Sequence, residues 1–275
     1  MTENRYQLFR WFKYAIYALL SLNVFLFFSE EWAAARLQYP FGIPVASLIE
    51  AFAATIDTAA WLVLLLMFET ETDILTDGQF TPPVVVALHG LRLFCYGFII
   101  YALYGYVANL RFVGAAELAR GISDLCAVVD EAWSYGITLD QFEPITDANC
   151  DSFSVATEFY RYAGMQALVD RGALTEIHRL AWVDVVNAGV WLLVVLNLEI
   201  DVRLQEQERL RGSVLLASNA CKAILYPVLF LAAVYWGVKG DFVDFWDAFL
   251  WLVAFAFIES NVFRWRREHT GQPVV

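Results

Sequence analysis

The sequence is poor in charged residues, and above all in basic ones. Only 17% of its 275 residues are charged, and 18 Lys and Arg stand against 30 Asp and Glu, for a net charge of −12. A chain with this balance lacks the basic surface that binds phosphate backbones, and no arginine-rich stretch alternates with aromatic residues for stacking on bases. These absences exclude nucleic acid as a partner.

The motifs of familiar enzyme and metal sites are also missing. There is no Cys-x-x-Cys, His-Glu-x-x-His, Gly-x-Ser-x-Gly, P-loop or Gly-x-Gly-x-x-Gly pattern, and the three histidines lie far apart in the chain. No apolar run carries basic residues at every third position, so a voltage sensor is not indicated. We therefore predict a protein that is not an enzyme and that holds no cofactor and no metal.

Long apolar runs dominate the sequence instead, with 60% hydrophobic residues. A helix of about 20 apolar residues crosses the hydrocarbon core of a bilayer. Six runs have about this length: Phe12–Phe28, Val45–Phe68, Val84–Val107, Ala181–Leu198, Val214–Trp236 and Phe242–Phe263. We predict an all-α fold, a polytopic protein of the lipid bilayer with six transmembrane helices in a single membrane domain, residues 1–275.

Basic residues predict the orientation, because they accumulate on the cytoplasmic side of a membrane. They gather before the first span, between the fourth and fifth, and after the sixth: Arg5, Arg10 and Lys13; Arg203, Arg209 and Arg211; Arg264, Arg266 and Arg267. We predict an integral, multi-pass protein of the cell (inner) membrane with both termini cytoplasmic. The link at 69–83 fits poorly, because it contains no Lys or Arg.

A signal peptide is the alternative interpretation of the first span. Basic residues precede its apolar stretch, and Ala33–Ala35 offers small residues for cleavage. Glu30 and Glu31 fit a cleavage region poorly, and the first span also belongs to the repeat described next. We therefore expect a membrane span here.

One motif occurs three times, in the second, fourth and sixth spans. It consists of an Asp or Asn, a Trp-Leu pair four residues later, and a Glu eight residues after the tryptophan. The first positions are Asp57, Asn187 and Asp247, and the last are Glu69, Glu199 and Glu259. The odd-numbered spans share a second pattern, a basic residue four positions before a tyrosine, with the basic residues Lys13, Arg92 and Lys222.

Each pattern recurs once in every pair of consecutive spans, and together they predict three pseudo-repeated helix pairs. The repeat units cover residues of about 5–75, 84–205 and 212–267. The alternative is coincidence, because Trp-Leu is common in apolar spans and acidic residues often mark helix ends.

The two patterns place opposite charges at similar depths near the cytoplasmic side. A lone charge in hydrocarbon costs several kcal/mol, and pairing is the usual way to retain it. We predict interhelical ion pairs between these residues: Lys13 with Glu69, Arg92 with Glu199, and Lys222 with Glu259. Such pairs either close a transport path or only hold helices in register, and the sequence leaves both roles open.

Further acidic residues lie deeper in the predicted membrane. The first positions of the repeated motif are twelve residues from its glutamate, about 18 Å along a helix. Asp184 and Asp244 lie three residues before Asn187 and Asp247, on nearly the same helix face. Carboxylates held away from water attract protons or cations. We predict that these four residues and Asp57 line a transport path in the outer half of the membrane; the alternative is hydrated acids at helix N-termini.

The link between the third and fourth spans, residues 111–180, is predicted to be an insertion on the outer side. We expect it to be mostly helical, with an amphipathic helix at 115–133, an acidic loop at 136–153, and further helix at 154–180 broken at Gly164 or Gly172. Cys126 and Cys150 both lie in this segment, where an oxidising compartment favours a disulfide. The alternative is that all four cysteines are unpaired. This segment also offers a surface for a protein partner.

Two functions of different classes remain. The first is a transport protein or channel for protons, cations or a small cationic solute. The second is a non-catalytic membrane subunit or scaffold of a larger complex, in which the ion pairs serve structure only. The three helix pairs resemble those of mitochondrial carriers in architecture, but the Pro-x-acid-x-x-basic signature of that family is missing, so no family membership and no oligomeric state follow.

Overall fold

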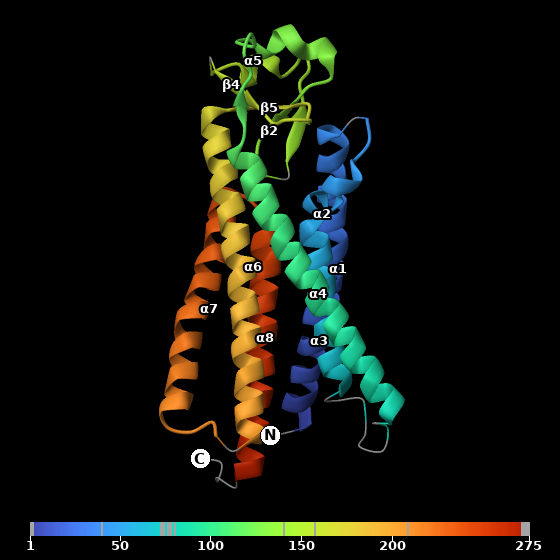
Figure 1. Cartoon of the computed structure of the whole chain (residues 1–275), viewed down its shortest axis with the longest axis vertical. Helices are drawn as coiled ribbons and strands as arrows, with labels where there is room; N and C mark the ends of the chain where they lie inside the picture. Colours follow the sequence, from blue (N-terminus) through green and yellow to red (C-terminus); the bar gives the residue numbers. More distant parts are fainter. Residues whose placement is uncertain are drawn as a thin grey trace. The chain divides into compact units, whose positions relative to one another are not determined.

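The computed structural model of the chain describes residues 3–39, 41–71, 75, 79, 81–139, 141–156, 158–207 and 209–270. Most of these residues are helical, with a small sheet between the fourth and sixth helices (Figure 1). The elements are α1 (Glu3–Gln38), η1 (Val45–Ser47), α2 (Leu48–Ala51), α3 (Ala53–Glu69), α4 (Pro82–Gly114), β1 (Glu117–Leu118), η4 (Leu125–Glu131), β2 (Ser134–Gly136), β3 (Phe142–Pro144), α5 (Cys150–Phe153), β4 (Phe159–Arg161), β5 (Ala167–Asp170), α6 (Arg171–Glu206), α7 (Ser213–Lys239) and α8 (Phe242–Thr270).

Four helices among the described residues are long and apolar enough to cross a membrane. They are Arg10–Leu37 within α1, Pro82–Gly114, Arg171–Leu204 within α6, and Ser213–Lys239. Their length and composition indicate a multi-pass membrane protein. The second predicted span, Val45–Phe68, is divided among η1, α2 and the 17-residue α3, with a break at Phe52, and the sixth falls in α8. That α3 and α8 also cross the membrane, and that the helices form three repeated pairs, stay predictions.

The ends of the long helices follow from their sequences. Pro82 and Pro83 stand at the start of α4, where the missing N–H costs no helical hydrogen bond. Gly240 ends α7 with a φ of 85°, a left-handed conformation that favours glycine. These residues therefore fix where the apolar runs become helices and where the chain turns.

The described chain forms two compact units. One contains residues 1–23 and 190–275, and so includes the first part of α1, the last part of α6, α7 and α8. The other contains residues 24–189, with α2, α3, α4 and the sheet. The two longest helices, α1 and α6, each contribute to both units. The prediction of a single membrane domain over 1–275 stays a prediction.

The segment between α4 and α6, residues 115–170, is called the inserted segment here. It contains a five-stranded sheet in the order β1-β4-β5-β2-β3, in which β2 and β5 are parallel and the other neighbours antiparallel. The prediction of a mostly helical insertion, and with it a purely α-helical fold, is wrong. Gly121 adopts a φ of 91°, which interrupts the expected helix at 115–133. Gly164, one of the two expected break positions, adopts a φ of 81°, but it separates β4 from β5 and not two helices.

Apolar side chains hold the inserted segment together in two clusters. One surrounds Leu125, Phe159 and Leu168, whose side chains are fully buried. The other joins the strands to the end of α4 through Val113 and to the first turns of α6 through Ile177. The sheet is thereby fixed to the ends of these two helices (Figure 1).

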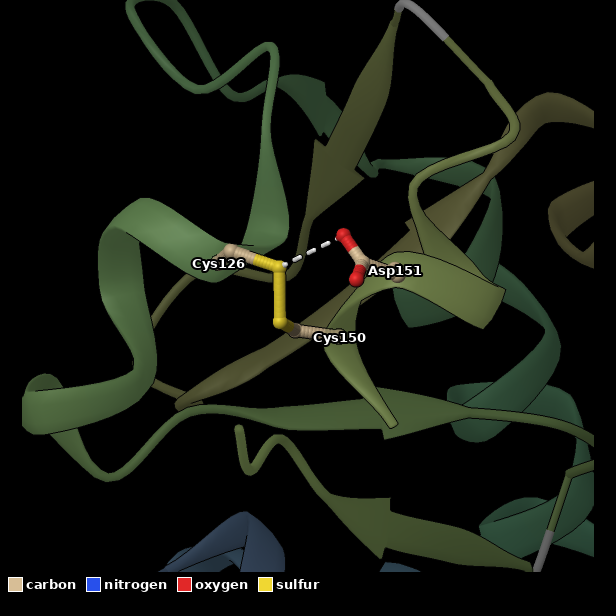
Figure 2. Close-up of side chains that lie close together, drawn as sticks. All are labelled: Cys126, Cys150 and Asp151. Atoms are coloured by element: carbon tan, nitrogen blue, oxygen red, sulfur yellow. Dashed lines mark hydrogen bonds between the residues drawn. A yellow bond between two sulfur atoms is a disulfide. The ribbon is translucent and has the colours of Figure 1, made fainter. Parts of the chain in front are cut away.

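Cys126 and Cys150 lie at disulfide distance, with their Cα atoms 4.9 Å apart. Figure 2 shows the two sulfur atoms joined, with Asp151 beside them. Oδ1 of Asp151 lies 3.3 Å from the sulfur of Cys126. Of the other two cysteines, Cys95 is buried and Cys221 exposed. The two cysteines are therefore placed for a disulfide, and the disulfide itself stays a prediction.

Candidate functional site

A carboxylate and an amide meet between α1 and α8. The side-chain amide of Asn23 donates a hydrogen bond of 2.8 Å to Oδ1 of Asp247. The indole of Trp251, one turn further along α8, also hydrogen-bonds to Asp247. Asn23 is completely buried and Asp247 is partly buried. The contact therefore shields both polar groups, Asn23 completely and Asp247 in part, from the surface of the protein.

The position of Asn23 places this contact well inside an apolar helix. Asn23 comes thirteen residues after Arg10 and fourteen before Leu37, the ends of the apolar stretch of α1. At 1.5 Å per residue, each end is about 20 Å away along the helix axis. A polar side chain at such a depth needs a protein partner, because lipid offers none.

The charge of Asp247 has no basic counterpart in the part of the chain that the structure describes. None of the ion pairs formed there involves Asp247. Oδ1 of Asn23 is likewise buried and accepts no hydrogen bond from a described residue. Among the described residues, the Asp247 carboxyl group thus lacks a basic partner, and Oδ1 of the neighbouring Asn23 lacks a hydrogen-bond donor.

A second polar cluster joins α6 to α7, and here the charges are balanced. Nζ of Lys222 lies 3.0 Å from Oδ2 of Asp201, and the same oxygen accepts a hydrogen bond of 2.7 Å from the hydroxyl of Ser218. Asn197 donates to the backbone carbonyl of Ser218. The side chains of Asp201 and Lys222 are only 7% and 15% exposed. This cluster is a buried, hydrogen-bonded ion pair.

The compact unit of residues 24–189 contains an ion pair of the same kind. The guanidinium of Arg92 on α4 lies 2.7 Å from Oε2 of Glu71, just after the end of α3. In both units the basic residue pairs with the acid two positions beyond the glutamate of the repeated motif, Glu71 after Glu69 and Asp201 after Glu199. Glu199 itself pairs with Arg203 on its own helix at 2.9 Å.

The three predicted ion pairs stay predictions. Lys13 and Glu69 are both buried, but they belong to different units, as do Arg92 and Glu199. The side chain of Glu259 lies outside the described residues. Lys13 also lies 5.3 Å from the ring centroid of Tyr14, within reach of a cation–π interaction.

The predicted transport-path residues fall in both units. Asp57, Asp184 and Asn187 belong to residues 24–189, and Asp244 and Asp247 to the other unit. Oδ2 of Asp57 lies 3.5 Å from the hydroxyl of Tyr106, at the long end of hydrogen-bond distances. Oδ1 of Asn187 is buried and accepts no hydrogen bond from a described residue. Convergence of all five residues on one path stays a prediction.

The tryptophans of the repeated motif, Trp61, Trp191 and Trp251, are all buried. The ring of Trp191 packs against Phe255 with centroids 4.6 Å apart, which joins α6 to α8. A shared buried position explains why the same spacing recurs in the sequence, whether or not the helices descend from one repeated pair.

In the inserted segment, the carboxyl group of Asp170 connects β5 to β2 and to the start of α6 by hydrogen bonds. Asp170 accepts hydrogen bonds from the backbone N–H of Ala173 at 2.8 Å and from the hydroxyl of Tyr135 at 2.7 Å. Burial acts to raise the pKa of Asp170, but these bonds and one from the N–H of Gly172 outweigh it, so the pKa is lowered from its ordinary value of 3.8. Burial and the Asp170 carboxylate raise the pKa of Tyr135 above its ordinary value.

Sequence reasoning missed Asn23, Glu71 and Asp201 as site residues. Asn23 could have been found, because it is an isolated amide in the middle of an apolar run. Glu71 and Asp201 are visible in the repeated motif as the second acid after the tryptophan, but spacing alone does not say which of two acids faces the neighbouring helix. Neither a model of a known protein family, nor a curated protein, nor a solved structure matches the chain.

Proposed function

We propose that this chain is a membrane transport protein or channel for protons, cations or a small cationic solute. The proposal depends on one observation: Asp247 is bonded to the fully buried Asn23 in an apolar helix pair, and no described basic residue balances its charge. In this proposal six spans cross the cell membrane and both termini are cytoplasmic.

The physical argument concerns the cost of an unbalanced charge. An ionised carboxylate in hydrocarbon without a counter-charge is unfavourable by several kcal/mol. Binding a proton or a cation removes this cost. A proton on Asp247 also gives the carboxyl group a donor for the free Oδ1 of Asn23, so that the amide and the carboxyl group can bond reciprocally. The site is therefore suited to taking up and releasing positive charge.

The balanced cluster of Lys222 and Asp201 has a different role in this proposal. Its lysine already neutralises the carboxylate, and its serine satisfies the same oxygen. Such a pair holds α6 against α7 and has no need of a transported ion. The Asp247 site carries the transport proposal, and the paired cluster supports the helices around it.

Flux into proteoliposomes tests the proposal. A potassium gradient with valinomycin sets the membrane potential, and a trapped dye reports proton entry, with a sodium-sensitive dye for cation entry. We expect Asp247→Asn to lower the flux at least tenfold and Asn23→Leu to lower it as well. Glu199→Gln is the matched control, because Glu199 is an α6 carboxylate that is 42% exposed and paired with Arg203.

The control variant should keep the flux within about a factor of two. Equal flux in wild type and Asp247→Asn would contradict the role of this carboxylate. Absence of any flux in the wild-type protein, together with a stable protein partner that co-purifies with it, would instead support a non-catalytic membrane subunit.

A further inference from the structure

A small cavity lies within the compact unit of residues 24–189, where α1, α4 and α6 meet the inserted segment. Its volume is about 40 Å³, which is room for roughly three water molecules. The helices contribute Glu31, Asn109 and Phe112 to its lining, and the inserted segment contributes Phe142 and Tyr162. This cavity is separate from the contact of Asn23 with Asp247, which belongs to the other unit.

The lining of the cavity includes a buried carboxyl group. Glu31 is only 7% exposed, and its carboxylate accepts hydrogen bonds from the backbone N–H groups of Ala54 and Thr55 and from the hydroxyl of Thr55. These bonds cap the start of α3 and hold the carboxylate in place. No lysine or arginine in the described ranges forms an ion pair with Glu31.

The lining also contains aromatic rings and a buried hydroxyl group. Tyr162 is 4% exposed, and its buried hydroxyl has no hydrogen-bond partner among the residues that the structure describes. Its ring lies 5.4 Å from that of Phe112, centroid to centroid, and Phe142 adds a third ring to the lining. A buried hydroxyl without a partner is uncommon and calls for a ligand or a bound water.

We propose that this cavity binds a small aliphatic ammonium ion of the size of methylammonium. The faces of aromatic rings attract ammonium groups, and the Glu31 carboxylate balances the charge. The unused hydroxyl of Tyr162 and the amide of Asn109 offer acceptors for its N–H groups. A bare Mg²⁺ or Ca²⁺ ion requires about six oxygen ligands, and this lining, in which Glu31 is the one carboxylate, does not provide them.

This binding site is independent of the transport proposal, because it involves neither Asp247 nor Asn23. Its test is calorimetric titration of the full-length protein in detergent with methylammonium chloride, at constant ionic strength, with sodium chloride as the reference titrant. We expect saturable binding of one methylammonium per chain and none of sodium.

Substitutions in the lining decide whether binding occurs in this cavity. Phe142→Leu keeps an apolar side chain but removes an aromatic face, and should weaken binding about tenfold. Glu31→Gln should weaken it by at least as much, and Tyr162→Phe by a smaller factor. Phe153→Leu is the matched control, because Phe153 stacks on Tyr135 at 4.4 Å within the inserted segment but does not line the cavity.

Glu31→Gln also removes a helix cap, so circular dichroism must first show that each variant is folded, and Phe142→Leu is decisive if Glu31→Gln is not folded. The proposal is overturned if folded wild-type protein binds no methylammonium, or if Phe142→Leu binds it as tightly as wild type. Asp247→Asn should bind methylammonium with wild-type affinity. Loss of binding in that variant would place the ligand elsewhere and would also overturn the proposal, whereas loss of flux alone would not.

Discussion

The inserted segment and the long helices differ in the polar side chains that they bury and in the large apolar side chains that they expose. In the inserted segment the fully buried residues are mainly apolar, such as Leu125 and Phe159. The long helices bury Asn23 and Asp201 and expose many large apolar side chains, among them Phe25, Leu93, Phe94, Ile100, Leu216 and Phe230. The inserted segment therefore has the apolar core of a domain that folds in water, whereas the long helices have the apolar surface of helices that are surrounded by lipid.

This difference teaches which interactions stabilise each region. Burying apolar surface drives folding in water but gives no net gain between helices that are surrounded by lipid. We therefore expect the inserted segment to depend on its apolar core and on the predicted disulfide between Cys126 and Cys150. The helices must depend on close packing and on polar contacts such as that of Lys222 with Asp201. A substitution in one region should therefore lower the stability of that region and leave the other unchanged.

The largest effect should come from breaking the buried ion pair of the helices. Lys222→Met leaves the Asp201 carboxylate buried without its counter-charge, and we expect the free energy of unfolding to fall by about 3–5 kcal/mol. Unfolding in a titration with sodium dodecyl sulfate, followed by circular dichroism, measures this change. Proteolysis of the inserted segment should be unaffected.

Two further variants separate the loss of pairing from the loss of the lysine side chain. Adding Asp201→Leu to Lys222→Met removes the unpaired charge and should recover most of the stability. Arg203→Met breaks the exposed pair with Glu199, and the change should stay below about 0.5 kcal/mol. Equal losses in the single and double Lys222 variants would show that the ion pair does not stabilise the helices.

The next effect should be confined to the inserted segment. Replacing Cys126 and Cys150, which are 24 positions apart, by serine removes the predicted disulfide, and we expect the free energy of unfolding to fall by about 3 kcal/mol. Limited proteolysis and hydrogen exchange within residues 115–170 should rise, while the helices keep their protection. Cys221→Ser is the control, because this exposed cysteine lies on α7.

Treatment with a reductant distinguishes a disulfide from two thiols. Reduction should reproduce the effect of the double serine variant in the wild-type protein and have none in the variant. If alkylation labels all four cysteines of the untreated protein, the predicted disulfide is wrong.

The sequence predicted the helices far better than the inserted segment. A run such as Pro82–Gly114 reveals its helix because lipid requires both apolar side chains and internal backbone hydrogen bonds. In the inserted segment, Leu118, Ile122, Leu125 and Val129 have helical spacing, yet they belong to a strand, a loop and a 3-10 helix. Strands of two to four residues are too short to show alternation, and their pairing depends on residues far away in the chain.

The candidate site was predictable in part for a similar reason. The motif identified Asp247 because an acid in an apolar run stands out by composition alone. Its partner Asn23 lies 224 positions earlier, and no local pattern connects the two. The basic residues Arg92 and Lys222 were recognised as members of ion pairs, whereas their acids, Glu71 and Asp201, depend on how α3 and α6 are rotated. The composition of the apolar runs identifies the charged residues that need a partner, but the packing of the helices determines which residue that partner is.

The smallest effect should be a dependence of the inserted segment on pH. Asp170 has a lowered pKa in the folded chain, so its bonds to Ala173 and Tyr135 contribute stability that is complete above the ordinary value of 3.8 and is lost as the pH falls through the lower folded value. Tyr135→Phe removes one of these bonds, and we expect a loss of about 1.5 kcal/mol at pH 7. Thermal unfolding of wild type, Tyr135→Phe and Asp170→Asn at several pH values measures the effect.

The direction of the pH dependence is the decisive part of this test. The stability difference between wild type and Asp170→Asn should be largest at neutral pH and should shrink in acid, because the protonated carboxyl group resembles the amide that replaces it. A constant difference for Asp170→Asn down to pH 3 would mean that packing, and not the charged cap of α6, joins the inserted segment to the helix.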